Sequence, residues 1–526
     1  MNANATAPPE RRTRPALTLI VVCAAIVLVP VTATGASVAL PDIGRELQTG
    51  LAAAQWVVNA FFLTFGSFMA ITGSLADLTG RRRMFMIGVA LFTAAMLVAS
   101  FAPNIAVLIG ARVLAGIGAA AATTGGSAVL AQTFEGPARL RAFAFFGTAI
   151  GMGLAFGPLV AGVLVTSLGG WRGFFLFAAV VVLPALLAAP LLAESRDPNP
   201  AGIDWAGAVT FTAGLSLFVF GLVQGPELGW TSPVVIGSLV AFAVLMTLFT
   251  VVERRKSHPM FDVSLFTQPR FVAICAMPVL LAFGFVALLI VLPPYFMAVD
   301  GVTAQYAGLL LVLLTGPTLV VPTLIGAIAA RVGQRVLLVA TMLLVAAGTA
   351  WLTVIEPGVG IATLAGPLLT IGIGFGISLA ILDGAAVSSV APSRAGMAAG
   401  IFNTMRLAGE AIAVALLGSL LAAVTQARLA ETAGDAAQGA TARLLQGDMD
   451  GAVAAVPAAL RDGFGTVAGA AYTDALHVGL WALAALSLVG AVAVGVLMGG
   501  APPADAEEAP EEGAAPGERP GALVEG

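Results

Sequence analysis

Charged residues are scarce in this sequence, and their scarcity bounds the class of protein. Asp, Glu, Lys and Arg make up 10% of the 526 residues, whereas a soluble domain carries about 25%. Hydrophobic residues make up 59%, and the mean hydropathy is +1.00. A soluble protein of this composition would have too little polar surface to stay in water. We therefore expect lipid to be the solvent of most of the chain.

Cysteine and histidine are also rare. The two cysteines, Cys23 and Cys275, lie inside apolar runs, which argues against a disulfide framework. The two histidines, His258 and His477, are too few and too far apart for a histidine-based metal site. The sequence contains neither a glycine-rich phosphate loop ending in lysine nor a Gly-x-Ser-x-Gly elbow. We expect no metal, no cofactor and no enzymatic activity.

A positive net charge is lacking too. The net charge of −4 gives no reason to expect a nucleic-acid partner. The acidic excess lies in the tail 499–526, which holds seven acidic residues and one basic residue, Arg519. Because the tail is rich in Pro, Glu and Ala, we expect it to be disordered.

Long apolar runs dominate what is present. A helix needs about 20 mostly apolar residues to cross a bilayer. The first run is longer than the signal-peptide core of about 7–15 residues, so we expect it to be a retained helix. The sequence contains fourteen candidate spans, near residues 16–40, 54–76, 84–101, 105–132, 141–166, 173–193, 205–225, 232–252, 271–297, 304–330, 336–355, 361–389, 398–423 and 472–498.

The basic residues orient these spans. With the N-terminus in the cytoplasm, 16 basic residues before the tail fall in cytoplasmic segments and five in external segments. The cytoplasmic set includes two runs, Arg81 to Arg83 and Arg254 to Lys256. This asymmetry follows the positive-inside rule, and it predicts an even number of spans with both termini in the cytoplasm.

The sequence repeats itself at a spacing of 253 residues. The matched pairs are Gly73 and Gly326, Ala76 and Ala329, Gly80 and Gly333, Arg82 and Arg335, and Leu40-Pro41 and Pro293-Pro294. The first six candidate spans therefore repeat as the last six, in parallel orientation, with two spans inserted between them. Internal repeats of this kind are typical of secondary transporters.

We therefore expect an all-α polytopic membrane protein made of two parallel six-helix bundles and two inserted central helices. The predicted segments are a cytoplasmic N-terminus (1–15), an N-terminal bundle (16–198), the inserted pair (199–252), a cytoplasmic linker (253–270), a C-terminal bundle (271–498) and the tail (499–526). An external loop at 424–471 is rich in Ala and Gly. It forms either short amphipathic helices over the outer mouth or a solvated spacer.

Three motifs carry a family resemblance. They are the loop Gly73–Arg83, with Gly73, Asp77, Gly80, Arg81 and Arg82; Leu108-x-x-x-Arg112-x-x-x-Gly116; and Gly153-x-x-x-Gly157-Pro158-x-x-x-Gly162, followed by Trp171-Arg172. In these residues the sequence resembles the major facilitator superfamily over about residues 16–498. The specific resemblance is to its 14-helix drug–proton antiporter branch of multidrug and antibiotic efflux proteins.

The resemblance implies a role for each motif, and each has a simpler structural alternative. The loop with Asp77 would latch the two halves together, or its arginines would only anchor the topology. Arg112, about 12 Å deep in its helix, would control a neighbouring proton site, or backbone carbonyls would hold it. The glycines around Pro158 would seal the outward side and favour exchange, or they would only allow close helix packing.

The thirteenth candidate span carries Asn403, Arg406 and Glu410. Arg406 and Glu410 are four residues apart and share one helical face. Near the midplane, Glu410 is either a proton-carrying carboxylate or the partner that neutralises Arg406. Asp383, near the cytoplasmic end of the twelfth span, is a second proton candidate or a solvated residue. Asn403 is a candidate for the lining of the substrate cavity.

One position departs from the family pattern. Many members of the branch carry an acidic residue in the first span, and counting back from Ala39-Leu40-Pro41 places Thr32 there. Glu410 or Asp383 would then take its role, or the substrate is not a cation.

We expect a secondary transporter of the cell membrane that exports amphipathic, drug- or antibiotic-like molecules by proton antiport with alternating access. The alternative is a narrow-substrate metabolite or lipid transporter of the same fold, without proton coupling. The expected partners are the small-molecule substrate, protons and membrane lipid, with no obligatory protein partner.

Overall fold

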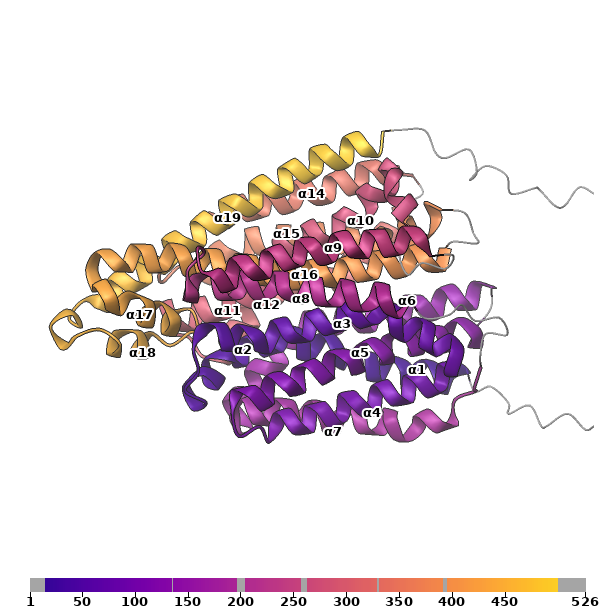
Figure 1. Ribbon diagram of the computed structural model, residues 1–526, viewed down its shortest axis with the longest axis horizontal. Helices are drawn as coiled ribbons and strands as arrows, with labels where there is room; N and C mark the ends of the chain where they lie inside the picture. Colours follow the sequence, from indigo (N-terminus) through magenta and orange to yellow (C-terminus); the bar gives the residue numbers. More distant parts are fainter. Residues whose placement is uncertain are drawn as a thin grey trace, which may run out of the picture.

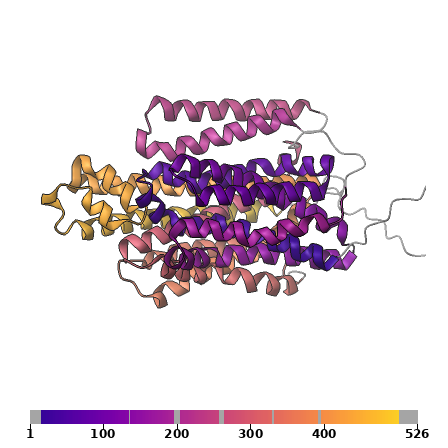
Figure 2. The same ribbon diagram turned by 90° about the horizontal axis from the view of Figure 1, so that it is seen from below.

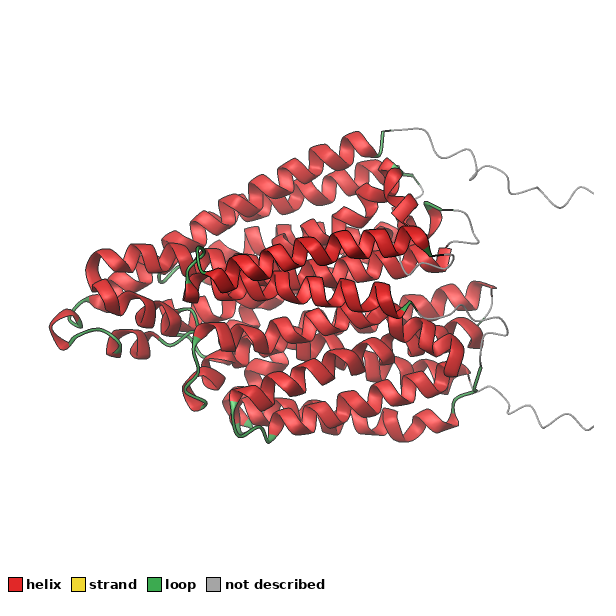
Figure 3. Cartoon of the chain, viewed as in Figure 1, coloured by secondary structure: helices red, strands yellow, loops and turns green. Residues whose placement is uncertain are grey.

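The structure is built from helices throughout the part of the chain that it describes. The computed structural model describes residues 15–134, 136–195, 204–256, 263–328, 331–390 and 395–499, and within these ranges no strand occurs (Figures 1 and 3). The predicted disorder of the tail concerns residues outside the described ranges, as does most of the predicted N-terminus. Both cysteines are free, and Cys275 is buried.

In the part of the chain that the structure describes, fourteen helical segments are long and apolar enough to cross a membrane, which confirms the predicted number of spans. They form the following spans in chain order: α1 and α2 (Pro15–Ile26, Leu28–Glu46); α3 (Leu51–Thr79); α4 (Arg81–Ser100); α5 (Ile105–Thr133); α6 (Gly136–Ser167); α7 (Gly170–Ala188); α8 (Trp205–Leu228); α9 (Pro233–Arg255); α10, η3 and α11 (Pro269–Leu281, Ala282–Val286, Ala287–Val299); α12 and α13 (Ala304–Thr315, Pro317–Ile328); α14 (Gln334–Trp351); α15 (Ile361–Ser388); α16 (Ala395–Ala433); and α19 (Phe464–Leu497).

Side-chain caps explain where several spans begin. The side chain of Asn104 accepts a bond from Val107 N at the start of α5, at 3.0 Å. Thr303 caps α12 in the same way, and Ser232 caps α9, where Pro233 occupies the first turn. Each cap satisfies a backbone N–H that the helix itself cannot bond, so the chain leaves the loop at a defined residue.

The predicted parallel repeat is visible in the packing. A Cβ on Gly116 of α5 would lie 2.6 Å from Phe61 O of α3, and one on Gly372 of α15 would lie 2.1 Å from Leu314 O of α12. Phe61 and Leu314 are 253 residues apart, as predicted, but Gly116 and Gly372 are 256 apart. The same helix contact therefore occurs in both halves, and the second half gains three residues before its fourth span.

The two halves meet along two pairs of helices. α3 packs against α16, and α6 packs against α12, so each pair combines one helix from each half (Figure 1). A third contact joins α2 and α11, where Ser37 Oγ donates to Leu289 O at 3.0 Å. These three contacts hold spans 1, 2 and 5 of the first half against spans 9, 10 and 13 of the second.

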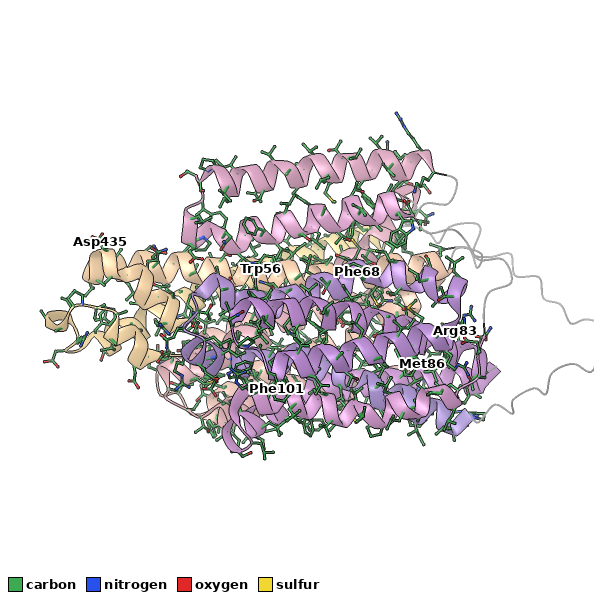
Figure 4. All side chains as sticks on the ribbon, turned by 60° about the horizontal axis from the view of Figure 1, so that its bottom comes forward. Trp56, Phe68, Arg83, Met86, Phe101 and Asp435 are labelled. Atoms are coloured by element: carbon green, nitrogen blue, oxygen red, sulfur yellow. The ribbon has the colours of Figure 1, made fainter. Side chains whose placement is uncertain are left out.

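The bundle has two distinct ends. Arg83 lies at the end where α1 begins and α19 finishes, which we call the terminus end (Figure 4). Asp435 lies at the opposite end, which carries α17 (Ala437–Leu444) and α18 (Met449–Ala454) and is called the cap end here.

The connection predicted as an external loop is a packed structure, so the solvated-spacer alternative is wrong. α16 continues to Ala433, and Ala440, Leu444 and Ala452 of the short helices are fully buried. Between these helices, Gln446 Nε2 donates to Thr49 O at 3.3 Å. A Cβ on Gly447 would lie 2.7 Å from Pro41 Cγ and 3.3 Å from Pro294 Cα, and these two prolines are repeat equivalents. The segment therefore covers the seam between the halves at the cap end.

The inserted helices lie beside the bundle, at the seam of α3 and α16 (Figure 2). α8 packs against both of these helices, and Ser419 Oγ of α16 donates to Leu222 O of α8. α9 packs mainly on α8, and most of its outer face is exposed, as expected for a helix that faces lipid.

A buried polar cluster fastens α8 to α9 at the terminus end. Asp204, with 3% of its side chain exposed, accepts a bond from Gly207 N at 2.7 Å and forms an ion pair with Lys256. Burial raises the pKa of Asp204, but Lys256, Gly207 and the adjacent Glu253 together hold the pKa below its usual range.

Two substitutions at Asp204 separate its cap from its charge. Asn also caps helices, so Asp204→Asn removes only the ion pair, whereas Asp204→Ala also removes a cap that contributes about 1 kcal/mol. We expect the thermal unfolding midpoint in detergent at neutral pH to fall in the order wild type, Asn variant, Ala variant.

Acid distinguishes the same variants. Because folding lowers the pKa of Asp204, its ionised carboxylate stabilises the folded state above the usual pKa of Asp, about 4. That stability is lost as the pH falls through the pKa of Asp204 in the folded state. The wild-type midpoint should therefore drop further between about pH 6 and pH 3 than that of Asp204→Asn. Equal losses in the two proteins would contradict the assignment.

Candidate functional site

Three of the predicted charged residues meet beside a small pocket in the second half. The pocket lies among α10, η3, α15 and α16, and its lining includes Pro278, Phe375, Asp383, Arg406 and Glu410. Arg406 Nη1 lies 3.8 Å from Asp383 Oδ1, with 26% of the Arg406 side chain and 57% of the Asp383 side chain exposed. The cavity measures about 20 Å³, far below the roughly 300 Å³ of a drug-sized site. The pocket is therefore closed around its own side chains in this conformation.

Glu410 lies deeper in the same pocket. It is one helical turn beyond Arg406 on α16 and is only partly buried, because it borders the cavity. Arg406 pairs with Asp383, while Glu410 has no ion-pair partner among the described residues. In this structure Arg406 is therefore paired with Asp383, which stays more than half exposed, and the predicted roles of Glu410 and Asp383 stay predictions.

A π-helical turn forms one wall of the pocket, and sequence reasoning did not predict it. η3 interrupts the ninth span at Ala282–Val286, just after Pro278 in α10. Within it, the ring of Phe285 stacks on Phe375 of α15, with centroids 3.8 Å apart. A π turn leaves backbone groups imperfectly bonded and is frequent at functional sites. In the sequence, Pro278 is a sign of a break in this span.

Two other predicted residues do not line this pocket. Thr32 is fully buried, and its hydroxyl donates to Val29 O of its own helix at 3.1 Å. Asn403 is partly buried on α16, one turn before Arg406. The position where the family carries an acid is thus packed into the first half in this conformation.

Arg112 is fully buried in α5. Its Nε donates to Val57 O at 2.8 Å, and its guanidinium lies 4.3 Å from the ring centroid of Phe61. Its two terminal nitrogens have no hydrogen-bond partner among the described residues. A backbone carbonyl and a phenyl face therefore hold the charge here, as the structural alternative predicts, and four donor hydrogens stay unused.

Asn59 of α3 was missed by sequence reasoning. It is fully buried, and neither atom of its amide has a hydrogen-bond partner among the described residues. Its signal was present in the sequence, since it is an amide inside an apolar span, one turn after Gln55.

The motif predicted as a loop from Gly73 to Arg83 is mostly helix. α3 runs through Thr79, and Gly80 alone separates it from α4. Gly73 therefore lies inside a helix and makes no turn, which corrects the expectation for this glycine. Gly80 has a φ of 117°, a conformation that residues with a side chain rarely adopt.

Glu194, which sequence reasoning also missed, organises the arginines after Gly80. Arg82 N donates to Glu194 Oε1 at 3.2 Å, and the Nε atoms of Arg82 and Arg83 lie 3.4 Å and 3.7 Å from Glu194 Oε2. Arg81 N donates to Ser195 O at 3.0 Å. All of these contacts stay within the first half; the side chain of Asp77 lies outside the described part of the chain.

The glycines of the fifth span pack against two different helices. Cβ atoms on Gly153 and Gly157 would lie 2.3 Å from Val27 O and 2.4 Å from Thr34 Oγ1, both in the first span. A Cβ on Gly162 would lie 2.4 Å from Ala304 O of α12, and one on Gly308 would lie 2.4 Å from Pro158 O. Gly153 and Gly157 therefore bind α6 into its own half, while Pro158 and Gly162 join it to the other half toward the cap end.

The residues that follow this motif clamp the cap end of the first half. Trp171 Nε1 and Arg172 Nε donate to the carboxylate of Glu46, at 2.7 Å and 3.0 Å. Arg172 also donates to Ser100 O and Ala102 O, so it joins the ends of spans 1, 3 and 6.

Within the described ranges, His, Cys, Asp and Glu nowhere gather in groups of three or more that could hold a metal ion.

Gly80 and Gly73 form a matched pair for testing this part of the site. A Cβ on Gly80 would lie 2.6 Å from Glu194 Oε1, and an alanine there would have to keep a φ that side chains disfavour. A Cβ on Gly73 would meet nothing within 4 Å. We expect Gly80→Ala to destabilise the protein by about 1–3 kcal/mol. Gly73→Ala should be neutral or stabilise it by about 0.5–1 kcal/mol. Thermal unfolding in detergent measures both, and a Gly80→Ala protein as stable as Gly73→Ala would refute this geometry.

Comparison with known proteins agrees with the architecture. A family model described as Major Facilitator Superfamily matches residues 22–414. In solved structures, the chain is similar to a bacterial homologue of the human lysosomal transporter Spinster in an inward-facing and occupied conformation. The TM-score is 0.66 at 16% identity, covering 94% of this chain and 97% of that one. At this identity the likeness shows the fold alone.

Curated relatives are closer in sequence. The multidrug resistance protein Stp of Mycobacterium tuberculosis is 33% identical over 415 residues, which cover 78% of this chain and 77% of that protein. The puromycin resistance protein pur8 of Streptomyces alboniger is 33% identical, covering 78% and 83%. The tetracenomycin C resistance and export protein of Streptomyces glaucescens is 30% identical, covering 78% and 77%. With fourteen spans, a repeated bundle and these relatives, the chain belongs to the Major Facilitator Superfamily, in its drug-efflux branch, and is a transporter rather than an enzyme.

Proposed function

We propose that this transporter exports amphipathic, drug- or antibiotic-like molecules across the cell membrane in exchange for protons. The observation that carries the proposal is Glu410, a carboxyl group that has no ion-pair partner among the described residues and borders a largely apolar pocket inside the membrane. An ionisable residue at this depth is costly and typically serves transport. The relatives named for resistance to, or export of, antibiotics support the substrate class.

Competition at the pocket would couple the two fluxes. Pro278, Ala282, Val286 and Phe375 supply apolar surface for an amphipathic molecule beside Glu410. Protonation would remove the charge of Glu410, and substrate binding would favour release of that proton, so the site would hold one or the other. Because Arg406 is engaged by Asp383, Glu410 stays available to exchange its proton.

The distribution of basic residues orients the transporter. Arg83 lies at the terminus end (Figure 4), next to Arg82 in the first turn of α4, and α9 also finishes at this end with Arg254, Arg255 and Lys256 (Figure 1). By the positive-inside rule, the terminus end faces the cytoplasm, with both termini there, and the cap end faces outward.

The packing supports a state that is closed on its outward side within an alternating-access cycle. Toward the cap end the halves are in backbone contact, as at Gly162 with Ala304 and Gly308 with Pro158. Gln446 and Gly447 cover the same end. Opening outward would require these contacts to part while the halves, about 16–198 and 271–498, close at the cytoplasmic end.

The motif at Gly80 would form the latch that closes the cytoplasmic end. In this state its arginines are held by Glu194 within the first half, so they are available to engage the second half when the cytoplasmic side shuts. Asp77→Asn should then lower the turnover rate by about tenfold or less while leaving substrate affinity near the wild-type value. Unchanged turnover in proteoliposomes would leave the motif as a topology anchor only.

Glu410→Gln tests the proton carrier. The amide keeps the size and polarity of the side chain but cannot release a proton at physiological pH, so proton-driven efflux should fall by about tenfold or more. The assay uses protein reconstituted in liposomes with an imposed pH gradient and a panel of fluorescent lipophilic dyes, with a protonophore as control. Asp383→Asn is the matched variant, and it should retain more activity because Asp383 is more than half exposed.

The outcomes separate the two candidate functions. Dye transport that collapses with the protonophore, together with an inactive Glu410→Gln protein, supports proton-coupled export. Full gradient-driven transport by Glu410→Gln removes Glu410 as the carrier. If the wild-type protein moves no dye, or is indifferent to the gradient, the alternative gains: a narrow-substrate metabolite or lipid transporter without proton coupling, in line with Thr32 at the family's acidic position.

A further inference from the structure

The second half contains a partial copy of the glycine motif found in the fifth span. Gly116 and Gly372, which make equivalent contacts in the two halves, are 256 residues apart. The same spacing carries Gly153 onto Gly409 and Gly162 onto Gly418, both on α16. The middle of the motif, Gly157-Pro158, has no such equivalent, because Ala413 and Val414 stand there.

The copied glycines make equivalent contacts. A Cβ on Gly153 would meet Val27 O at 2.3 Å, and one on Gly409 would meet Val279 Cα at 2.8 Å. Val27 and Val279 fall within one residue of each other in the repeat, whose spacing is 253 here. Farther along, Gly162 approaches α12 of the other half, and Gly418 approaches Gln55 of α3, again in the other half. In each motif, the first glycine thus packs its helix against the opening span of its own half, and the last glycine contacts the other half.

Both opening spans are irregular at this contact. The first span is interrupted at Val27, between α1 and α2, and Pro30 follows. The ninth span contains Pro278 and the π turn Ala282–Val286. At the repeat spacing, Val27 and Pro30 correspond to residues 280 and 283, so the two irregularities fall at the same level. In each half a glycine therefore packs on a break in the neighbouring helix.

The residue after the glycine differs between the halves. Leu154 follows Gly153, whereas Glu410 follows Gly409. Glu410 borders the pocket that is lined by Pro278, Ala282 and Val286 of the broken ninth span. The same contact between a glycine and an interrupted helix is therefore followed by an apolar side chain in the first half and by a carboxyl group in the second.

We propose that Gly409 is a positioning residue for Glu410. Its missing side chain lets α16 approach α10 until Val279 touches the helix backbone, and this contact fixes the carboxyl of the next residue against the π turn. The inference rests on the proposed role of Glu410 in proton exchange. It adds that Gly409 determines the position of the Glu410 carboxyl and its access to water. Any side chain at position 409 would separate the two helices and admit water beside Glu410.

Gly409→Ala and Gly400→Ala test this proposal on one helix. A Cβ at position 409 would be 2.8–3.1 Å from three atoms of Val279, whereas one at position 400 would meet nothing within 4 Å. The measurement is the pH dependence of dye–proton exchange in proteoliposomes. We expect the half-maximal pH of Gly409→Ala to move by about half a unit or more toward lower pH, since added water favours the charged carboxylate. Gly400→Ala should keep the wild-type profile.

A second variant covers the case in which Gly409→Ala does not fold. Val279→Ala loosens the same contact from the opposite helix without adding bulk, and it should shift the profile in the same direction by a smaller amount. A wild-type pH profile in whichever of these two variants folds overturns the positioning role, even if the maximal rate falls. Glu410→Gln in the same assay keeps the two ideas apart. If it still transports with the gradient, the proposed carrier fails; if it is inactive while Gly409→Ala keeps the wild-type profile, only the present inference fails.

Discussion

Close approach of helix backbones at glycine is the interaction on which the rest of this structure depends. Lipid tails are as apolar as leucine, so apolar surface alone gives helices no reason to associate inside a membrane. Contact area must come from backbones that nearly touch, and the glycines of this chain supply it. At Gly88, Gly116, Gly118 and Gly125, an added Cβ would lie 2.1–2.6 Å from a neighbouring atom. Such contacts build each half, and those at Gly162 and Gly308 join the halves.

Packing of this kind also decides where charge can be held. A tightly packed bundle of glycine, alanine and apolar side chains has few places for an ionised group, and each such place needs its own solution. Arg112 is held by a carbonyl and a phenyl face, and Arg406 by Asp383 at the edge of a pocket. Glu410 instead borders the pocket that the π turn of the ninth span lines. Of these three charged groups, Glu410 is thus the one that lies beside an interrupted helix.

Sequence reasoning predicted the spans and the repeat because both depend on local patterns. Twenty apolar residues cross a bilayer whatever their neighbours, and Gly80 with its arginines recurs at a fixed spacing. The failures have non-local causes. Nothing before Gly80 breaks a helix, so α3 continues to Thr79. Glu194 is an ordinary acid until the fold places it beside Arg82. The connection after α16 folds because Gln446 and Gly447 find partners on spans distant in sequence.

Under the proposed function, the repeat explains how one half would carry the proton chemistry alone. Two equivalent helix breaks, each packed on a glycine, offer two equivalent places for an ionisable group near the midplane. In the first half, Thr32 satisfies its hydroxyl within its own helix, and Leu154 follows the glycine, so that break is apolar and closed. In the second half, the corresponding break is a π turn facing Glu410. A rocking motion of two such unequal halves would change the surroundings of one carboxyl only. A single site whose exposure alternates would couple a proton to a substrate, because it could not hold both at the same time.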